Sequence, residues 1–410
     1  MPANEKKRAR ERASSVLIFA PGLVRYPANS AGVVADVLAG TLDRQREGRY
    51  SAENSVETAP RGLRVGKTIL GPSGEPLLEV FELDYRDRLD EMDAEGGRDT
   101  PPGILKAAWF SLKGLGLLIS AARRPAKSGM AKVQLLLGLL ATVALMASAV
   151  AAIIAGLAAM DLLAWVPDRL TDWFPYEVDA STVAVGGATG IALLWVKFRK
   201  VLLKLAEQTR KSLQYLDEPR YRDTVTHTLD DAIDGLLDGG WKCPIHVLGY
   251  SFGSLVAIDA LFPKSGSLPE GDRLASAVSS LTTIGCPADA VRLYFPGYYP
   301  RALARVPDVP WTNVFNGADV FGSNFNDGTD LKPADSTLAF GGASPTSLRY
   351  TDERLSFGRV LRGLGFKTHC GYWDLPGRAN CLGLVMDIWI PQGLGRGAKG
   401  DNLEPATPAN

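Results

Sequence analysis

Five residues in the second half of the chain carry the strongest chemical signal of the sequence. Residues 249–253 read Gly-Tyr-Ser-Phe-Gly, which places Ser251 in the spacing Gly-x-Ser-x-Gly. A serine at the tip of a sharp turn can attack a carbonyl carbon, and the glycines leave room for the adjoining strand and helix. The backbone N–H of Phe252 then points at the negative charge that develops on the carbonyl oxygen. The motif therefore predicts Ser251 as a nucleophile and Phe252 as an oxyanion donor.

The residues on either side of this motif have the pattern that such a turn needs. The apolar run 245–248 is typical of a buried strand, and residues 255–262 have the helical spacing of apolar side chains. A strand, a tight turn and a helix in this order form a nucleophile elbow. The alternative is a tight strand-to-helix turn without catalysis.

Strands and helices are predicted to alternate along much of the chain. Apolar runs predict strands at 15–19, 77–83, 281–284 and 312–315, and helical spacing predicts helices at 31–42 and 222–237. Such alternation favours a protein of the α/β class, with a mostly parallel sheet covered by helices on both faces.

Composition excludes several classes of protein. The chain has 410 residues, no net charge and 46% hydrophobic residues, so it can bury a large core but lacks the basic surplus of a nucleic-acid-binding domain. Its four cysteines are scattered and form no Cys-x-x-Cys pair, which indicates free thiols in a reducing compartment and no metal site. We expect no nucleic-acid partner and no metal.

Two apolar runs in the middle of the chain predict a transmembrane helical hairpin. Residues 133–160 contain 28 residues without a charge, which is long enough for a tilted span. Residues 180–196 form a second charge-free run of 17 residues, near the lower limit for a span. The alternatives are a buried helix pair in a soluble domain, or a hairpin that enters one leaflet without crossing it.

The charges that flank these runs predict the orientation of the hairpin. Residues 101–132 contain six basic residues and no acidic residue, and four basic residues follow the second run between 197 and 204. The loop between the runs is acidic, so the positive-inside rule places both outer flanks in the cytoplasm. We therefore expect a two-span membrane protein with both termini and the α/β domain on the cytoplasmic side.

With these motifs, the sequence resembles the α/β-hydrolase superfamily, in particular its lipase and esterase branches. The resemblance covers roughly residues 15–83 and 222–389. It implies an α/β-hydrolase fold interrupted by the membrane hairpin, and it implies a catalytic order of Ser, then acid, then His. The domain boundaries that follow are a basic tail at 1–14, a first part of the α/β-hydrolase domain at 15–100, a membrane insertion at 101–211, a second part at 212–390 and a disordered tail at 391–410.

The implied order leaves one histidine as the general base. The chain contains three histidines, and only His369 follows Ser251. His369 lies in a loop-like run near the end of the predicted domain, which is where the family carries its catalytic histidine. His246 is expected to be buried in the strand before Ser251, and His227 to lie on the surface of a polar helix.

The resemblance leaves the acid open between several residues. Asp319 follows the predicted strand 312–315, which is where similar lipase-like sequences carry the acid that orients the histidine. Asp289, which follows the preceding strand, is the second candidate, and Asp327 and Asp330 remain alternatives. A further alternative is that Asp319 only caps a turn and has no catalytic role.

The second oxyanion donor is implied to come from the loop after the first strand. Family members often carry His-Gly there, whereas this chain has Pro21-Gly22. Alignment on the glycine gives the N–H of Leu23, since Pro21 has no N–H to donate.

These residues together predict a membrane-anchored serine hydrolase that needs no cofactor. Its substrate would be an ester, either a lipid or another acyl compound, because the hairpin would hold the catalytic domain at a membrane surface. An acyltransferase that uses the same Ser251 is an alternative, as is a non-catalytic interaction protein on the same scaffold.

Overall fold

The structure is a computed structural model, which describes residues 13–23, 30–46, 48–55, 58–96, a few positions between 114 and 121, 210–262, 274, 276–299, 309–319, 321–325, 345–350, 364–373 and 380–390. The chain divides into two compact units, and the larger one holds the whole sheet. That unit comprises Met1–Met92, Arg220–Arg292 and Gly297–Asn410.

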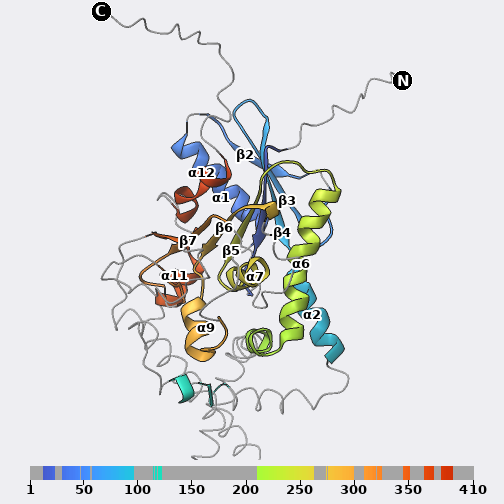
Figure 1. Ribbon diagram of the computed structural model, residues 1–410. Coiled ribbons are helices and arrows are strands. Elements are labelled where there is room, and N and C mark those ends of the chain that lie inside the picture. The colour runs from blue at the N-terminus through green and yellow to red at the C-terminus, as the bar shows by residue number, and fades with distance from the viewer. Residues whose placement is uncertain are drawn as a thin grey trace, which may run out of the picture. The chain divides into compact units, whose positions relative to one another are not determined.

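An eight-stranded mixed sheet forms the centre of this unit (Figure 1). Its order is β2-β3-β4-β1-β5-β6-β7-β8. The six strands from β4 to β8 in this order are parallel, whereas β2 and β3 are antiparallel to their neighbours. The strands are β1 (Ser15–Ala20), β2 (Ser51–Asn54), β3 (Leu63–Leu70), β4 (Pro76–Leu83), β5 (Ile245–Tyr250), β6 (Val278–Ile284), β7 (Trp311–Phe315) and β8 (Thr346–Arg349).

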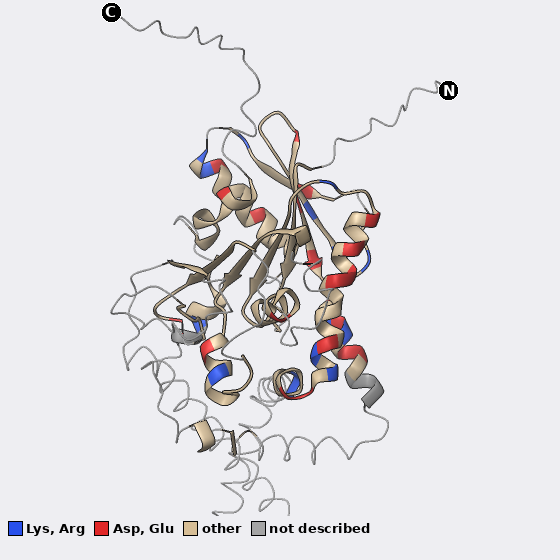
Figure 2. Ribbon diagram, in the orientation of Figure 1, with Lys and Arg blue, Asp and Glu red and all other residues tan. Residues whose placement is uncertain are grey.

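The central strands are buried on both faces, as parallel strands between helices must be. Every residue of β1 and β5 is buried. The strands β1, β5, β6 and β7 contain no Lys, Arg, Asp or Glu, whereas such residues lie along the helices (Figure 2). Successive side chains of a strand point to opposite faces, so the apolar residues of these buried strands supply two cores.

Helices cover the two faces of the sheet (Figure 1). One core joins Leu17 and Phe19 of β1 to α1, η4 and α12. On the other face α7 packs on β5 and β1, and Phe81 of β4 makes an edge-to-face contact with Trp241, which lies three residues after α6. The helices are α1 (Ala31–Gln45), α2 (Tyr85–Gly96), α6 (Pro219–Asp238), α7 (Phe252–Leu261), α9 (Ala288–Tyr294), α11 (Leu364–Cys370), the 3-10 helix η4 (Cys381–Leu384) and α12 (Met386–Trp389).

The architecture confirms the predicted α/β class with a mostly parallel sheet and helices on both faces. Within the ranges given above, no helix is both long and apolar enough to span a lipid bilayer. The predicted hairpin at residues 133–160 and 180–196 lies outside those ranges, as do the predicted tails apart from residues 13 and 14.

Candidate active site

Ser251 occupies a strained turn between β5 and α7. Its backbone angles are φ 53° and ψ −121°, and among the residues that the structure describes it is the only non-glycine with a positive φ. Such a conformation costs about 1–3 kcal/mol and persists only where the surrounding structure enforces it. The N–H of Ser251 donates to the carbonyl of Ile284 on β6 over 2.9 Å, which ties the turn to the next strand.

The two glycines of the motif are needed for steric reasons. A Cβ atom at Gly249 would lie 2.6 Å from the Cα of Ser254, in the first turn of α7. A Cβ atom at Gly253 would lie 2.5 Å from the carbonyl oxygen of Pro21, and closer still to the carbonyl oxygen of Ala20 at the end of β1. The turn therefore brings α7, β5 and the loop after β1 into direct contact.

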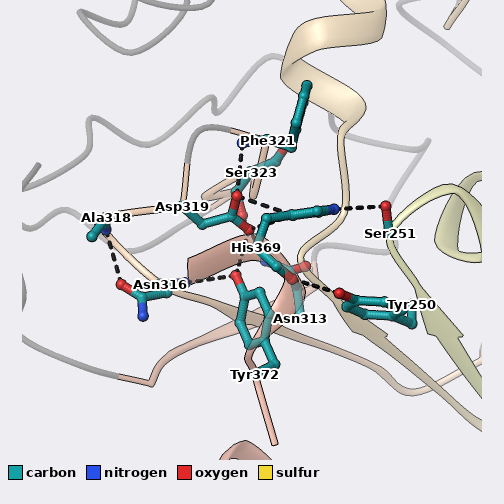
Figure 3. Close-up of polar contacts among 10 residues, drawn as sticks. All are labelled: Tyr250, Ser251, Asn313, Asn316, Ala318, Asp319, Phe321, Ser323, His369 and Tyr372. Atoms are coloured by element: carbon teal, nitrogen blue, oxygen red, sulfur yellow. Dashed lines mark hydrogen bonds and ion pairs between the residues drawn. The ribbon is translucent and has the colours of Figure 1, made fainter. Parts of the chain in front are cut away.

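Three side chains from separate parts of the chain form a hydrogen-bonded relay (Figure 3). The Oγ of Ser251 lies 2.7 Å from Nε2 of His369, and Nδ1 of His369 lies 2.9 and 3.0 Å from the two carboxylate oxygens of Asp319. An ionised carboxylate can only accept, so Nδ1 carries the proton and Nε2 is the acceptor for the Ser251 hydroxyl. This is the tautomer that a general base requires.

Burial differs along this relay in a way that suits its chemistry. Asp319 is 0% exposed and His369 is 8% exposed, whereas Ser251 is partly accessible. A buried carboxylate interacts strongly with the imidazole because little water screens the pair. The exposed end of the relay is therefore the hydroxyl that would meet a substrate.

Asp319 lies in a tight turn directly after β7. Its N–H donates to the carbonyl of Asn316 over 3.0 Å, and the side chain of Asn316 accepts from the N–H of Ala318 over 2.9 Å. The Oδ1 atom of Asp319 accepts from the N–H of Phe321 over 2.8 Å. Asp319 thus caps its own turn while its carboxylate faces His369.

The structure brings Asp319, and not Asp289, to the imidazole of His369. Asp289 lies in the first turn of α9, and its N–H donates to the hydroxyl of Ser323 over 2.9 Å. Asp327 and Asp330 lie outside the described residues.

The backbone N–H groups of Phe252, the first residue of α7, and of Leu23, in the loop after β1, belong to segments that follow neighbouring strands. β1 and β5 are parallel neighbours, with Ala20 opposite Gly249, so the loops that follow them leave the sheet side by side. Tyr85, at the start of α2, donates its hydroxyl to the carbonyl of Pro21 and stacks on Phe252, with ring centroids 6.3 Å apart. One buried side chain therefore contacts both predicted oxyanion segments.

The other two histidines lie where the sequence placed them. His246 is buried in β5, and its Nδ1 lies 2.8 Å from the hydroxyl of Ser280. Burial lowers the pKa of His246 to about 4, so this imidazole is neutral near pH 7. His227 is exposed on α6 beside Asp230.

One expectation about the local setting of the base was wrong. His369 lies near the end of the short helix α11 rather than in a loop. Its run of seven residues contains a glycine and lacks a repeated apolar period, which is why the sequence pattern did not predict a helix there.

Two tyrosines contact the relay, and the sequence had not predicted a role for either (Figure 3). Tyr250 donates its hydroxyl to the carbonyl of His369 and stacks on the imidazole, with centroids 5.8 Å apart. Tyr372 donates to Oδ2 of Asp319 over 2.7 Å. Tyr250 occupies a variable position of the motif, and nothing in its spacing signals a contact 119 residues away. Tyr372 follows His369 by three residues, which was the one available clue.

Comparison with family models, with curated proteins and with solved structures found no match. Among the described residues, no group of His, Cys, Asp and Glu side chains is arranged to hold a metal ion.

Proposed function

We propose that this chain is a serine hydrolase that cleaves esters through an acyl-enzyme. The observation that carries the proposal is the relay from Ser251 through His369 to Asp319, with Ser251 in a strained strand-to-helix turn. A serine with a purely structural role does not need such a strained turn. A nucleophile does, because the turn exposes its hydroxyl and brings backbone N–H donors close to it.

The reaction would proceed in two halves. Nε2 of His369 takes the proton of the Ser251 hydroxyl, and the oxygen attacks the ester carbonyl. The N–H groups of Phe252 and Leu23 stabilise the oxyanion, and Asp319 stabilises the imidazolium. His369 then returns the proton to the leaving alkoxide, which leaves an acyl group on Ser251. Water, activated by the same imidazole, releases the acid and restores the hydroxyl.

Within the α/β class, the topology supports an α/β-hydrolase fold for this domain. The nucleophile follows β5, the acid follows β7 and the base follows β8, in the order Ser, acid, His. The loop proposed to supply the second oxyanion donor follows β1, the neighbour of β5. Ser251 and Asp319 thus follow the carboxyl ends of the parallel strands β5 and β7, and His369 of α11 hydrogen-bonds to both.

A lipid or another membrane-partitioned ester is the substrate class that we favour. This part of the proposal rests on the charge-free runs at residues 133–160 and 180–196, with basic flanks and an acidic connection. A hairpin of this kind would hold the catalytic domain at the cytoplasmic face of a membrane. External protease added to intact cells should then cut only near residues 168–179, and cleavage within the α/β domain would contradict the orientation.

A matched pair of carboxylate substitutions tests the catalytic proposal. With a short-chain chromogenic ester, we expect Asp319→Asn to lower kcat by about 10⁴-fold, because the amide cannot hold the required tautomer. Asp289→Asn should retain kcat within about threefold, because Asp289 does not contact His369. The reverse result, with turnover lost only in Asp289→Asn, would reject the assigned acid. Near-wild-type turnover by Ser251→Ala would reject the proposed function itself.

A further inference from the structure

The hydroxyl of Tyr372 joins the acid of the relay to the strand that carries it (Figure 3). It lies 2.7 Å from Oδ2 of Asp319 and 3.0 Å from the backbone nitrogen of Asn316 at the end of β7. The N–H of Asn316 can only donate, so the Tyr372 oxygen accepts there. The single hydroxyl proton is therefore directed to the carboxylate of Asp319.

Burial keeps Tyr372 in the form of a donor. Its side chain is 1% exposed, and burial together with the charge of Asp319 raises the pKa of the hydroxyl well above its usual value. The phenol thus remains protonated throughout the pH range in which a histidine acts as a base.

Two glycines leave no room for this pair to move. A Cβ atom at Gly322 would lie 2.6 Å from Oδ2 of Asp319 and 3.0 Å from the Tyr372 hydroxyl. A Cβ atom at Gly285 would lie 2.9 Å from the Tyr372 ring. Close packing of this kind holds the tyrosine and the carboxylate in one arrangement.

The two oxygens of Asp319 are held by different donors. The N–H of Phe321 holds Oδ1 over 2.8 Å, and the Tyr372 hydroxyl holds Oδ2 over 2.7 Å. With both oxygens held, the plane of the carboxylate is fixed, and Nδ1 of His369 meets the two oxygens at nearly equal distances, 3.0 and 2.9 Å. Loss of either donor removes one of the contacts that fix the plane of the carboxylate.

We propose that Tyr372 is a positioning residue of the active site, which acts on catalysis only by fixing the carboxylate of Asp319 against His369. This inference rests on the proposed function. Tyr372 would then be a fourth side chain of the relay. Its contribution to kcat should disappear when Asp319 is no longer a carboxylate.

Tyr372→Phe tests the proposal, because it removes the hydroxyl and keeps the ring. A hydrogen bond to a charged group that acts in the transition state predicts a decrease in kcat of about 10- to 100-fold. We expect KM for the chromogenic ester to change by less than about twofold, since Tyr372 lies behind Asp319 and does not face the substrate. Tyr350→Phe is the matched control, because it removes a hydroxyl from a ring that stacks on Tyr372 with centroids 6.0 Å apart, and it should keep wild-type kcat.

A double-mutant cycle separates positioning from a general structural role. In the Asp319→Asn background, Tyr372→Phe should lower kcat by less than about twofold further. Gly322→Ala, which displaces the same contact without removing the hydroxyl, should show the same dependence on Asp319 and serves as the second variant if Tyr372→Phe does not fold.

Three results would overturn the inference. They are wild-type kcat in folded Tyr372→Phe, an equal loss of kcat from Tyr372→Phe in both backgrounds, and a loss that appears in KM alone. Absence of turnover in the wild-type chain would instead reject the proposed function, and the inference with it.

Discussion

Gly253→Ala places a single methyl group where α7 meets the loop after β1. The new Cβ atom would lie 2.5 Å from the carbonyl oxygen of Pro21, whereas ordinary van der Waals contact begins near 3.4 Å. The helix and the loop must separate by at least about 0.9 Å at this point, the difference between these two distances, because the carbonyl oxygen of Ala20 lies closer still to the new Cβ atom. The separation moves the N–H groups of Phe252 and Leu23 apart.

The expected magnitude follows from this displacement. Overpacking of a close contact costs about 1–3 kcal/mol of stability. A misplacement of about 1 Å in a catalytic constellation costs about 100-fold in rate. We therefore expect Gly253→Ala to react with a fluorophosphonate at least about 100-fold more slowly than the wild type, with a lower midpoint of urea unfolding.

Gly40→Ala is the matched control for this substitution. Gly40 lies inside α1, and a Cβ atom there would have its nearest neighbour, the Nη1 of Arg44, at 3.6 Å. Alanine in a helix interior should stabilise the chain by about 0.5–1 kcal/mol and leave the labelling rate unchanged. Wild-type labelling and wild-type stability of Gly253→Ala would refute the steric argument.

Two further predictions concern the free energy of unfolding. Ser251→Gly should be more stable than Ser251→Ala by about 1 kcal/mol, because glycine adopts the positive φ of 53° without strain, and equal urea midpoints of the two variants would contradict this. Burial lowers the pKa of His246 from 6.5 to about 4, so its contribution to stability is complete above pH 6.5 and is lost as the pH falls toward 4. That loss amounts to about 3 kcal/mol at most. His246→Gln should therefore flatten the urea-unfolding profile between pH 7 and pH 4.5, and an unchanged slope would refute the assignment.

The central strands were predictable from the sequence because burial on both faces produces continuous apolar runs. β1 and β5 come close to this pattern, and β7 has apolar residues on both sides of Thr312 and Asn313. All three strands lie within a residue or two of the predicted ranges. β2 and β8 were not predicted, because β2 is largely exposed, β8 is only half-buried and neither has an apolar run. Such edge strands are specified by their neighbours in the sheet rather than by their own composition.

The resemblance favoured Asp319 as the acid, but the spacing of residues alone could not decide between Asp319 and Asp289. Asp289 and Asp319 each follow a strand of the same parallel sheet, so spacing along the chain treats them alike. Only the geometry distinguishes them, because it brings the Asp319 carboxylate within 3.0 Å of His369. The hydrogen bond from Tyr372 to Asp319 could not be predicted for a similar reason, because the two residues lie 53 positions apart in the sequence.

The most direct test of the account is the reaction of the full chain, in detergent, with a fluorophosphonate, followed by intact-mass measurement and peptide mapping. We expect one adduct per chain, on the peptide that contains Ser251, and no adduct in Ser251→Ala. No adduct on folded wild-type protein would contradict the account, as would an adduct that persists at another residue in Ser251→Ala.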